Sequence, residues 1–326
     1  MGREPAASRR GTAPGDPLAP SVGPQYRSGF VSLAGRPNAG KSTLLNRIVG
    51  RDLAITSTHP QTTRRNIRGV VTSADAQVII VDTPGLHRPR TLLGERLNEL
   101  TKSTWADVDL VCWCLVAGEK AGPGDRHLAA ELAAARTPVV VVVTKTDIAT
   151  QAQIASRLAD AASLSRAAEL DPVEFVPVSA VTGQNVDVLL SVIKARLPIG
   201  PMLFPATDVT DQSDEDLIAE LIRQAALAGV RDELPHSLAV TIDEMGPRDG
   251  RAEQRPLIDI HATIHVERDS QKPIIIGKGG VRLRELGTRA RHDIERLLDA
   301  RVHLDLHVRV AKDWQRDPKQ LGRLGL

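Results

Sequence analysis

The chain has 326 residues, a length that predicts two domains. Its charge is nearly balanced, with 42 Lys and Arg against 40 Asp and Glu, so the total favours no class of partner. Two cysteines exclude a secreted scaffold held by several disulfides, and the lack of a long apolar run excludes an integral membrane protein. These totals predict a cytoplasmic protein.

The chain begins with an Ala-, Pro- and Gly-rich segment, residues 1–27, which has little to bury and is expected to be a disordered tail. Over residues 28–198 the pattern changes to apolar runs separated by amphipathic stretches. The runs expected to be buried strands are FVSLAG, QVIIVD, DLVCWCLVA, TPVVVVVTK and EFVPVSA, and the stretches typical of helices include GDRHLAAELAAAR and NVDVLLSVIKARL. This alternation predicts an α/β domain with a mostly parallel sheet covered on both faces.

A second domain is expected after a proline-rich linker, residues 199–212. Residues 213–326 predict an amphipathic helix DLIAELIRQAAL, strands HSLAVTIDEM and LIDIHATIHVER, a basic helix from 281 to about 300, and a strand VHLDLHVRV. The strict alternation in the last segment is typical of a strand with one face in solvent. The second domain is therefore predicted to be a small α+β unit.

The first predicted strand runs into GRPNAGKST, which fits the phosphate-binding pattern G-x-x-x-x-G-K-[ST] and opens a helix. Gly35 and Gly40 let backbone N–H groups surround an anion, Lys41 can reach the outer phosphates, and Ser42 can ligate Mg²⁺. A chance Gly-rich turn is the alternative, but the strand and helix on either side favour phosphate binding. The expected cradle comprises Gly35, Arg36, Pro37, Asn38, Ala39, Gly40, Lys41, Ser42 and Thr43.

A metal site is expected beside the cradle. Asp82 ends the strand QVIIVD, where a carboxylate can hold Mg²⁺, and Gly85 can offer its N–H to a γ-phosphate. Thr63 is the preferred hydroxyl to close over the metal, with Thr62 the alternative. The predicted metal ligands are Ser42, Thr63 and Asp82, and the segment expected to line the nucleotide is Asp82, Thr83, Pro84, Gly85 and Leu86.

A base pocket is expected where two later strands end. Asp147 can accept two hydrogen bonds from guanine, and a carboxylate placed for those donors discriminates against adenine. The stem of Lys145 can lie along the base, and the Ala180 N–H can meet the guanine oxygen. The residues expected here are Thr144, Lys145, Thr146, Asp147, Ser179 and Ala180.

The second domain contains the G-x-x-G sequence of Gly277 to Gly280, followed by the basic helix. Glycines at such a turn let a sugar-phosphate backbone approach closely, as in KH domains, which clamp single-stranded RNA. Between residues 271 and 296 there are seven Lys and Arg against three Asp and Glu. A helix-helix turn with a solvated basic face is the alternative. The expected RNA contacts are Ile276, Gly277, Lys278, Gly279, Gly280, Arg282, Arg284 and Arg291.

The motifs GRPNAGKST, QTTR, DTPG, TKTD and SA resemble the five G motifs of translation-factor-type GTPases. Together with PHSLAV, HVERDSQKPIIIGKGG and VAKDW, they make the chain similar to the Era family of bacterial GTPases. The resemblance implies a P-loop GTPase domain followed by a type II KH domain, with GTP or GDP and Mg²⁺ as ligands. It also implies a monomer that binds the 3′ end of 16S rRNA, assists assembly of the 30S subunit, and contacts the inner face of the membrane peripherally.

Two positions bear on turnover and nucleotide binding. Leu86 cannot orient water by hydrogen bonding, which predicts slow intrinsic hydrolysis. The resemblance implies that K⁺ assists, held in part by Asn38, so the expected catalytic groups are Lys41, Thr63, Gly85 and Asn38. Thr144 stands where the family usually has Asn, which ties the base loop to the cradle.

Other functions are compatible with parts of this pattern. A non-hydrolysing RNA chaperone would explain Leu86, a Ras-like signalling switch would leave the KH domain unexplained, and an ATPase or kinase is disfavoured by TKTD. The favoured hypothesis is that ordering of the loops around Thr63 and Gly85 changes how the KH domain meets RNA. Arg64 and Arg65 are expected to lie in an exposed basic loop.

Overall fold

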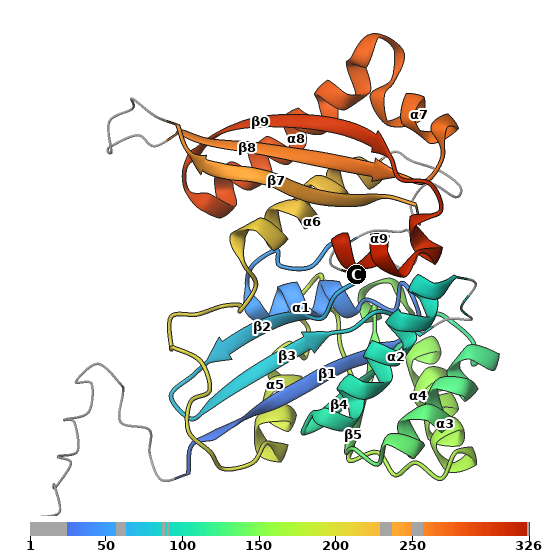
Figure 1. Ribbon diagram of the computed structural model, residues 1–326. Coiled ribbons are helices and arrows are strands. Elements are labelled where there is room, and N and C mark those ends of the chain that lie inside the picture. Colours follow the sequence, from blue (N-terminus) through green and yellow to red (C-terminus); the bar gives the residue numbers. More distant parts are fainter. Residues whose placement is uncertain are drawn as a thin grey trace, which may run out of the picture.

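The computed structural model describes residues 25–56, 63–86, 89, 91–228, 237–248, 257–324 and 326. Nearly all of the expected tail and the alternative ligand Thr62 lie outside these residues. Figure 1 shows two sheets with their helices, one above the other, and the C-terminal helix α9 at the junction between them. The first domain contains a six-stranded sheet with helices, and the second contains a three-stranded sheet with helices, including the expected basic helix. The predicted α/β and α+β classes are therefore confirmed.

The first sheet has six strands in the order β2-β3-β1-β4-β5-β6. All neighbouring pairs are parallel except β2 with β3, which is antiparallel, and β2 is the strand that the sequence analysis did not predict. The strands are β1 Arg27–Gly35, β2 Ile67–Thr72, β3 Ala76–Asp82, β4 Leu110–Val116, β5 Val139–Thr144 and β6 Glu174–Pro177.

Helices cover both faces of this sheet, which explains the continuous apolar strands. In β4, Cys112 and Cys114 pack on the side of α1 and α5, whereas Val111 and Trp113 pack on the side of α2, α3 and α4. The helices are α1 Lys41–Val49, α2 Leu92–Asp107, α3 Pro123–Ala135, α4 Gln151–Ala167 and α5 Val186–Arg196, with a short 3₁₀ turn, η1, at Thr146–Ile148.

The second sheet has the order β7-β8-β9, with β7 antiparallel and β9 parallel to β8. One face is covered by α6 and α8, and the alternate residues Ile260, Ala262 and Ile264 of β8 fill the core between them. The elements are α6 Asp214–Leu227, β7 Ala239–Pro247, β8 Leu257–Val266, η3 Asp269–Gln271, α7 Lys272–Ile276, η4 Lys278–Gly280, α8 Val281–Leu298, β9 Arg301–Val310, η5 Trp314–Arg316 and α9 Pro318–Arg323.

The topology explains why the predicted nucleotide motifs meet. The strands β1, β3, β5 and β6 are parallel, and the cradle, Asp82, Thr144 and Ser179 follow or end them at the same edge of the sheet. None of the described helices has both the length and the apolar character that crossing a membrane requires.

Candidate nucleotide and RNA sites

The phosphate cradle is shaped by backbone conformation. Gly40 has a left-handed backbone with φ of 84° and stands at the N-cap of α1 without a side-chain cap, so the first N–H groups of the helix face the cradle. The Nζ atom of Lys41 donates to the carbonyl oxygens of Gly35 and Arg36, each at 3.1 Å. Burial lowers the pKa of Lys41, and the nearby Asp82 carboxylate acts in the opposite direction. The Lys41 side chain is therefore already folded over the anion site.

The three predicted metal ligands converge. The hydroxyls of Ser42 and Thr63 donate to Asp82 Oδ2 at 2.6 and 3.2 Å, and the two hydroxyl oxygens lie 3.3 Å apart. Asp82 is fully buried, and burial raises the pKa of its carboxyl group. Its Oδ1 atom has no hydrogen-bond partner among the described residues. A buried carboxylate with one unsatisfied oxygen beside two hydroxyls fits Mg²⁺, which prefers oxygen ligands and water.

Gly85 lies against the cradle. A Cβ atom at this position would stand 3.0 Å from the Pro37 nitrogen and 3.3 Å from Lys41 Nζ, tighter than most side-chain contacts, so this close approach of the backbone favours glycine. The Thr83 hydroxyl donates to the Leu33 carbonyl at 3.0 Å, which anchors the segment to the sheet. Because the Thr83 side chain faces inward, any contact it makes with a nucleotide must come from the backbone.

Leu86 does not face the phosphate cradle. It is nearly buried in the apolar cluster that contains Trp105 of α2 and Leu128 of α3. An apolar side chain held in the core cannot hydrogen-bond a water molecule at the phosphates, as the sequence analysis expected. Leu86 therefore contributes to the packing of the core.

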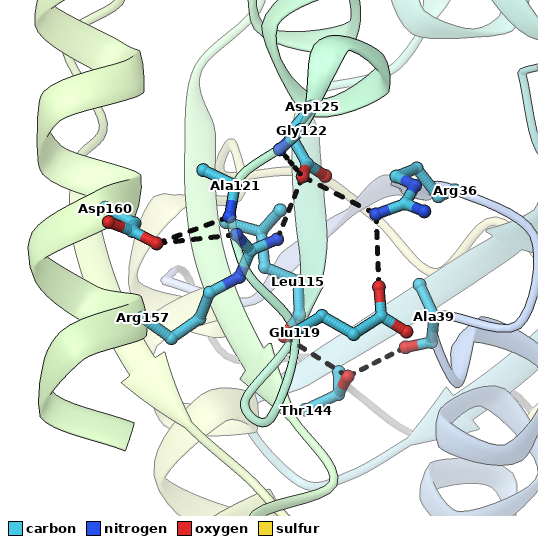
Figure 2. Close-up of polar contacts among 10 residues, drawn as sticks. All are labelled: Arg36, Ala39, Leu115, Glu119, Ala121, Gly122, Asp125, Thr144, Arg157 and Asp160. Carbon is cyan, nitrogen blue, oxygen red and sulfur yellow. Dashed lines mark hydrogen bonds and ion pairs between the residues drawn. The ribbon is translucent and has the colours of Figure 1, made fainter. Parts of the chain in front are cut away.

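The base loop is tied to the cradle by Thr144 in place of the usual Asn. Figure 2 shows its hydroxyl between two carbonyls, and it donates to Ala39 at 2.8 Å and to Leu115 at 3.3 Å. The second base loop is joined to the first because the Ser179 hydroxyl donates to Asp147 Oδ1 at 2.6 Å. Asp147 is exposed, so its carboxylate is accessible to a base. Thr144, although shorter than the usual Asn, thus connects the base loop to the cradle.

The side chain of Arg36 leaves the cradle. Figure 2 shows it reaching Glu119 and Asp125, with N–O distances of 3.1 and 3.6 Å. Asp125 also pairs with Arg157 at 3.3 Å and accepts from the Gly122 N–H at 2.9 Å, and the Asp125 and Arg157 side chains are 1% exposed. The predicted nucleotide contact of Arg36 therefore falls to its backbone. Its side chain connects the cradle to α3 and α4, a connection that the sequence did not indicate.

The G-x-x-G turn joins α7 to α8. Gly277, Gly279 and Gly280 have φ angles of 73°, 61° and 77°, a region that other residues rarely adopt, and Lys278 between them is exposed. A groove begins at this turn and runs between α8 and β9. Its lining residues are Gly280, Leu283, Arg284, Gly287, Thr288, Arg291, His303, Leu304 and Leu306.

The groove contains some of the predicted RNA contacts and several that were missed. Arg284 and Arg291 line it, but Arg282 points elsewhere and donates to the Ala228 carbonyl at 3.5 Å. Ile276 packs against the core of the second domain. The β9 side of the groove had no signal in the sequence, although the isolated Gly287 within a helix was one available sign of a close approach.

The loop that directly follows Thr63 contacts the second domain. Arg64 is 5% exposed, donates to the Leu238 carbonyl, and has its guanidinium 5.4 Å from the centre of the Trp314 ring. Arg65 pairs with Asp216 of α6 at the same junction. The expectation that both arginines lie in an exposed loop is wrong, because the second domain covers Arg64 and Arg65 is half-buried against it.

The segment after Gly85 also meets the second domain. Leu93 and Leu97 of α2 form an apolar cluster with Trp314, Leu321 and Leu324 of the C-terminal segment. Arg96 donates to the Leu326 carbonyl at 3.1 Å. Both segments next to the metal site therefore adjoin the C-terminal segment.

Two family models match separate parts of the chain. A family described as "50S ribosome-binding GTPase" matches residues 30–145, and the KH domain family matches residues 233–315. GTPase Era of Nocardioides sp. is 58% identical over 303 residues, covering 93% of this chain and 97% of the relative. GTPase Era of Mycobacterium tuberculosis is 58% identical over 304 residues, covering 92% and 99%.

Solved structures give the same result. A variant of Aquifex aeolicus Era bound to GDP and AlF₄⁻ is similar to this chain with a TM-score of 0.86 and 36% identity, covering 92% of this chain and 99% of that one. Era in complex with MgGDPNP and nucleotides 1506–1542 of 16S ribosomal RNA gives the same TM-score, identity and coverage.

The fold and the two sites define a P-loop GTPase joined to a type II KH domain. Such a protein binds guanine nucleotide with Mg²⁺ and hydrolyses GTP. The chain belongs to the Era family of GTPases, which confirms the resemblance seen in its motifs.

Proposed function

We propose that this protein is a GTP-timed switch that binds the single-stranded 3′ end of 16S rRNA in its KH groove and assists assembly of the 30S subunit. The observation that carries the proposal is the groove between α8 and β9, which begins at the G-x-x-G turn and has arginines along one wall. The relative solved with 16S rRNA nucleotides supports this choice of RNA. We place the protein in the cytoplasm as a monomer, with a peripheral contact at the inner face of the membrane.

In this proposal the nucleotide is held by the cradle, with Lys41 on the outer phosphates and Asp147 on guanine. Ser42, Thr63 and Asp82 hold Mg²⁺, which neutralises charge on the phosphates when bound. The Gly85 N–H meets the γ-phosphate, a role that the nearness of Gly85 to the cradle residues Pro37 and Lys41 supports. Hydrolysis depends on positioning by these residues, because Leu86 contributes no hydrogen bond to water.

The RNA proposal is tested with two neighbouring arginines on one helix. Arg284 lines the groove, whereas Arg282 points to the Ala228 carbonyl. We expect Arg284→Ala to weaken binding of the 16S 3′-end fragment about tenfold, and to reduce the dependence of log affinity on log salt by about one, because one phosphate contact is lost. Arg282→Ala, the matched control, changes affinity less. Fluorescence anisotropy across a salt series measures both quantities.

Two results would contradict the proposal. Equal losses for the two arginine variants would show that the groove is not the binding surface. Equal affinity for a scrambled RNA of the same length would show that the 16S 3′ end is not its target, because a KH groove reads bases as well as phosphates.

A second part of the proposal concerns K⁺ as an activator, with Asn38 as one of its ligands. Asn38 is exposed in the cradle and has φ of 63°. We expect faster GTP hydrolysis in K⁺ than in Na⁺ at equal ionic strength, and we expect Asn38→Ala to remove the difference. Asn38→Gly separates loss of the amide from backbone strain, because glycine adopts this conformation freely. Equal rates for the wild type in both salts would reject this role of K⁺.

A further inference from the structure

The metal site and the RNA groove are linked by a chain of buried contacts. Thr63, a predicted metal ligand, is 6% exposed and is followed directly by Arg64, which enters the second domain. Consecutive Cα atoms are about 3.8 Å apart, so Thr63 cannot move far from Asp82 while Arg64 stays in place. The two side chains therefore hold one another in position across the domain boundary.

Arg64 inserts its side chain against residues of the second domain. Its guanidinium lies over the Trp314 ring and donates to the Leu238 carbonyl. Trp314 is fully buried, and cation–π contacts strengthen when water is excluded. Burial lowers the pKa of Arg64 to about 9, which leaves the side chain charged at neutral pH.

From Trp314 the contacts continue toward the G-x-x-G turn. The Trp314 indole N–H donates to the Ser237 carbonyl at 3.2 Å, and the Gln271 side-chain amide donates to the Ser237 hydroxyl at 3.0 Å. Gln271 Oε1 in turn accepts from the backbone N–H groups of Glu267 and Arg268 at 2.8 and 3.0 Å. Gln271 immediately precedes α7, and α7 ends at Ile276, just before Gly277. A short, buried polar path thus leads from Arg64 to the turn that opens the groove.

We infer that Arg64 is a positioning residue that joins Thr63 at the metal site to Trp314, and that through this joint bound GTP and bound RNA stabilise one arrangement of the two domains. The inference rests on the proposed function, because it names the residues that couple its two sites. Arg64 touches neither ligand. Its effect is on the free energy of coupling between them, which must be reciprocal.

The test measures RNA affinity of the full chain in two nucleotide states. The dissociation constant for the 16S 3′-end fragment is determined with Mg²⁺-GDP and with a non-hydrolysable Mg²⁺-GTP analogue. For the wild type we expect binding at least about fivefold tighter with the analogue, the lower end of typical allosteric coupling. For Arg64→Ala we expect the two constants to agree within about twofold, a loss of coupling that general destabilisation would not produce.

Matched variants separate this joint from other contacts at the boundary. Arg68 lies on β2, only four residues away, and pairs with Asp211 of the linker in an exposed ion pair. Such pairs contribute little, so Arg68→Ala should keep the wild-type ratio. Arg64→Lys keeps a cation over the ring and should restore part of the ratio. Trp314→Phe keeps an aromatic ring but loses the N–H to Ser237, and should reduce the ratio.

The outcomes distinguish the inference from the proposed function. RNA binding with equal affinity in both nucleotide states of the wild type would overturn the inference and leave the RNA target of the proposed function standing. No binding of the fragment in either state would overturn the proposed function as well. If Arg64→Ala does not fold, Arg64→Lys and Trp314→Phe decide, and a wild-type ratio in both would overturn the inference.

Discussion

The nucleotide site is formed by backbone groups and buried polar side chains, whereas the RNA groove is formed by exposed side chains of one helix and one edge strand. Asp82 and Lys41 are fully enclosed and already contact the groups around them. Arg284 and Arg291 stand at the surface. The nucleotide site is therefore pre-organised, and we expect a single substitution there to cause a large loss of affinity. In the RNA groove we expect single substitutions to cause smaller losses.

The largest expected effect is in the enclosed site. Lys41→Ala removes a charge that we expect to contact two phosphates, and hydrogen bonds to charged groups contribute about 1.5–3 kcal/mol each, so GTP binding should weaken roughly 100-fold or more. Titration with a fluorescent GTP analogue measures this. Nucleotide-free RNA binding by the same variant is the control, and it should stay at the wild-type value. A loss below tenfold would show that the enclosed site is less sensitive than this comparison implies.

A smaller effect is expected where the base loop meets the cradle. Thr144→Ala removes the hydrogen bond to the Ala39 carbonyl, a contribution of about 1 kcal/mol, so GDP and GTP affinities should each fall about fivefold. Thr144→Asn supplies the usual residue of the family and should retain wild-type affinity. If the alanine variant binds as tightly as the wild type, the tie between the two loops does not contribute to affinity.

The smallest effect is expected at Gly287 in the groove, where a substitution should raise the stability of the fold and lower the affinity for RNA. A Cβ atom at Gly287 of α8 would lie 3.5 Å from Leu306, an ordinary contact, so alanine fits. Gly287→Ala should raise the free energy of unfolding by about 0.8–1 kcal/mol, because glycine is a poor helix former. It should also weaken RNA binding roughly threefold, a cost of about 0.6 kcal/mol, because the methyl group narrows the groove.

The helical Gly322 provides a matched control for this prediction. No atom lies within 4 Å of the Cβ that alanine would add there. Gly322→Ala should therefore raise stability without changing RNA affinity. Thermal unfolding and anisotropy on the two variants test this together. Unchanged RNA binding by Gly287→Ala would place the RNA away from the middle of α8.

The sequence predicted those parts of the molecule that depend on short, contiguous patterns. Asp82, Thr144 and Ser179 could be placed together in advance, because the carboxyl ends of parallel strands meet at one edge. The β9 wall of the groove could not be predicted. Leu304 and Leu306 face α8 only through the register of a three-stranded sheet, which no local pattern specifies.

The burial of Arg64 was missed for a related reason. Read along the chain, QTTRRN is a polar segment, and nothing local shows that Trp314, 250 positions later, covers one of its arginines. The same holds for Arg36, whose partner Asp125 lies beyond three intervening strands in the sequence. In both cases the partner of the arginine lies far away in the sequence, so no local pattern predicts the contact.

Gly287 has a consequence for engineering this protein. Most natural proteins can be stabilised by replacing helical glycines with alanine, and a screen for heat resistance would therefore favour that exchange here. The same exchange would partly fill the groove next to Leu306. Selection for heat resistance alone would therefore lower RNA affinity while the stability of the fold improved, and a useful screen must include the RNA ligand.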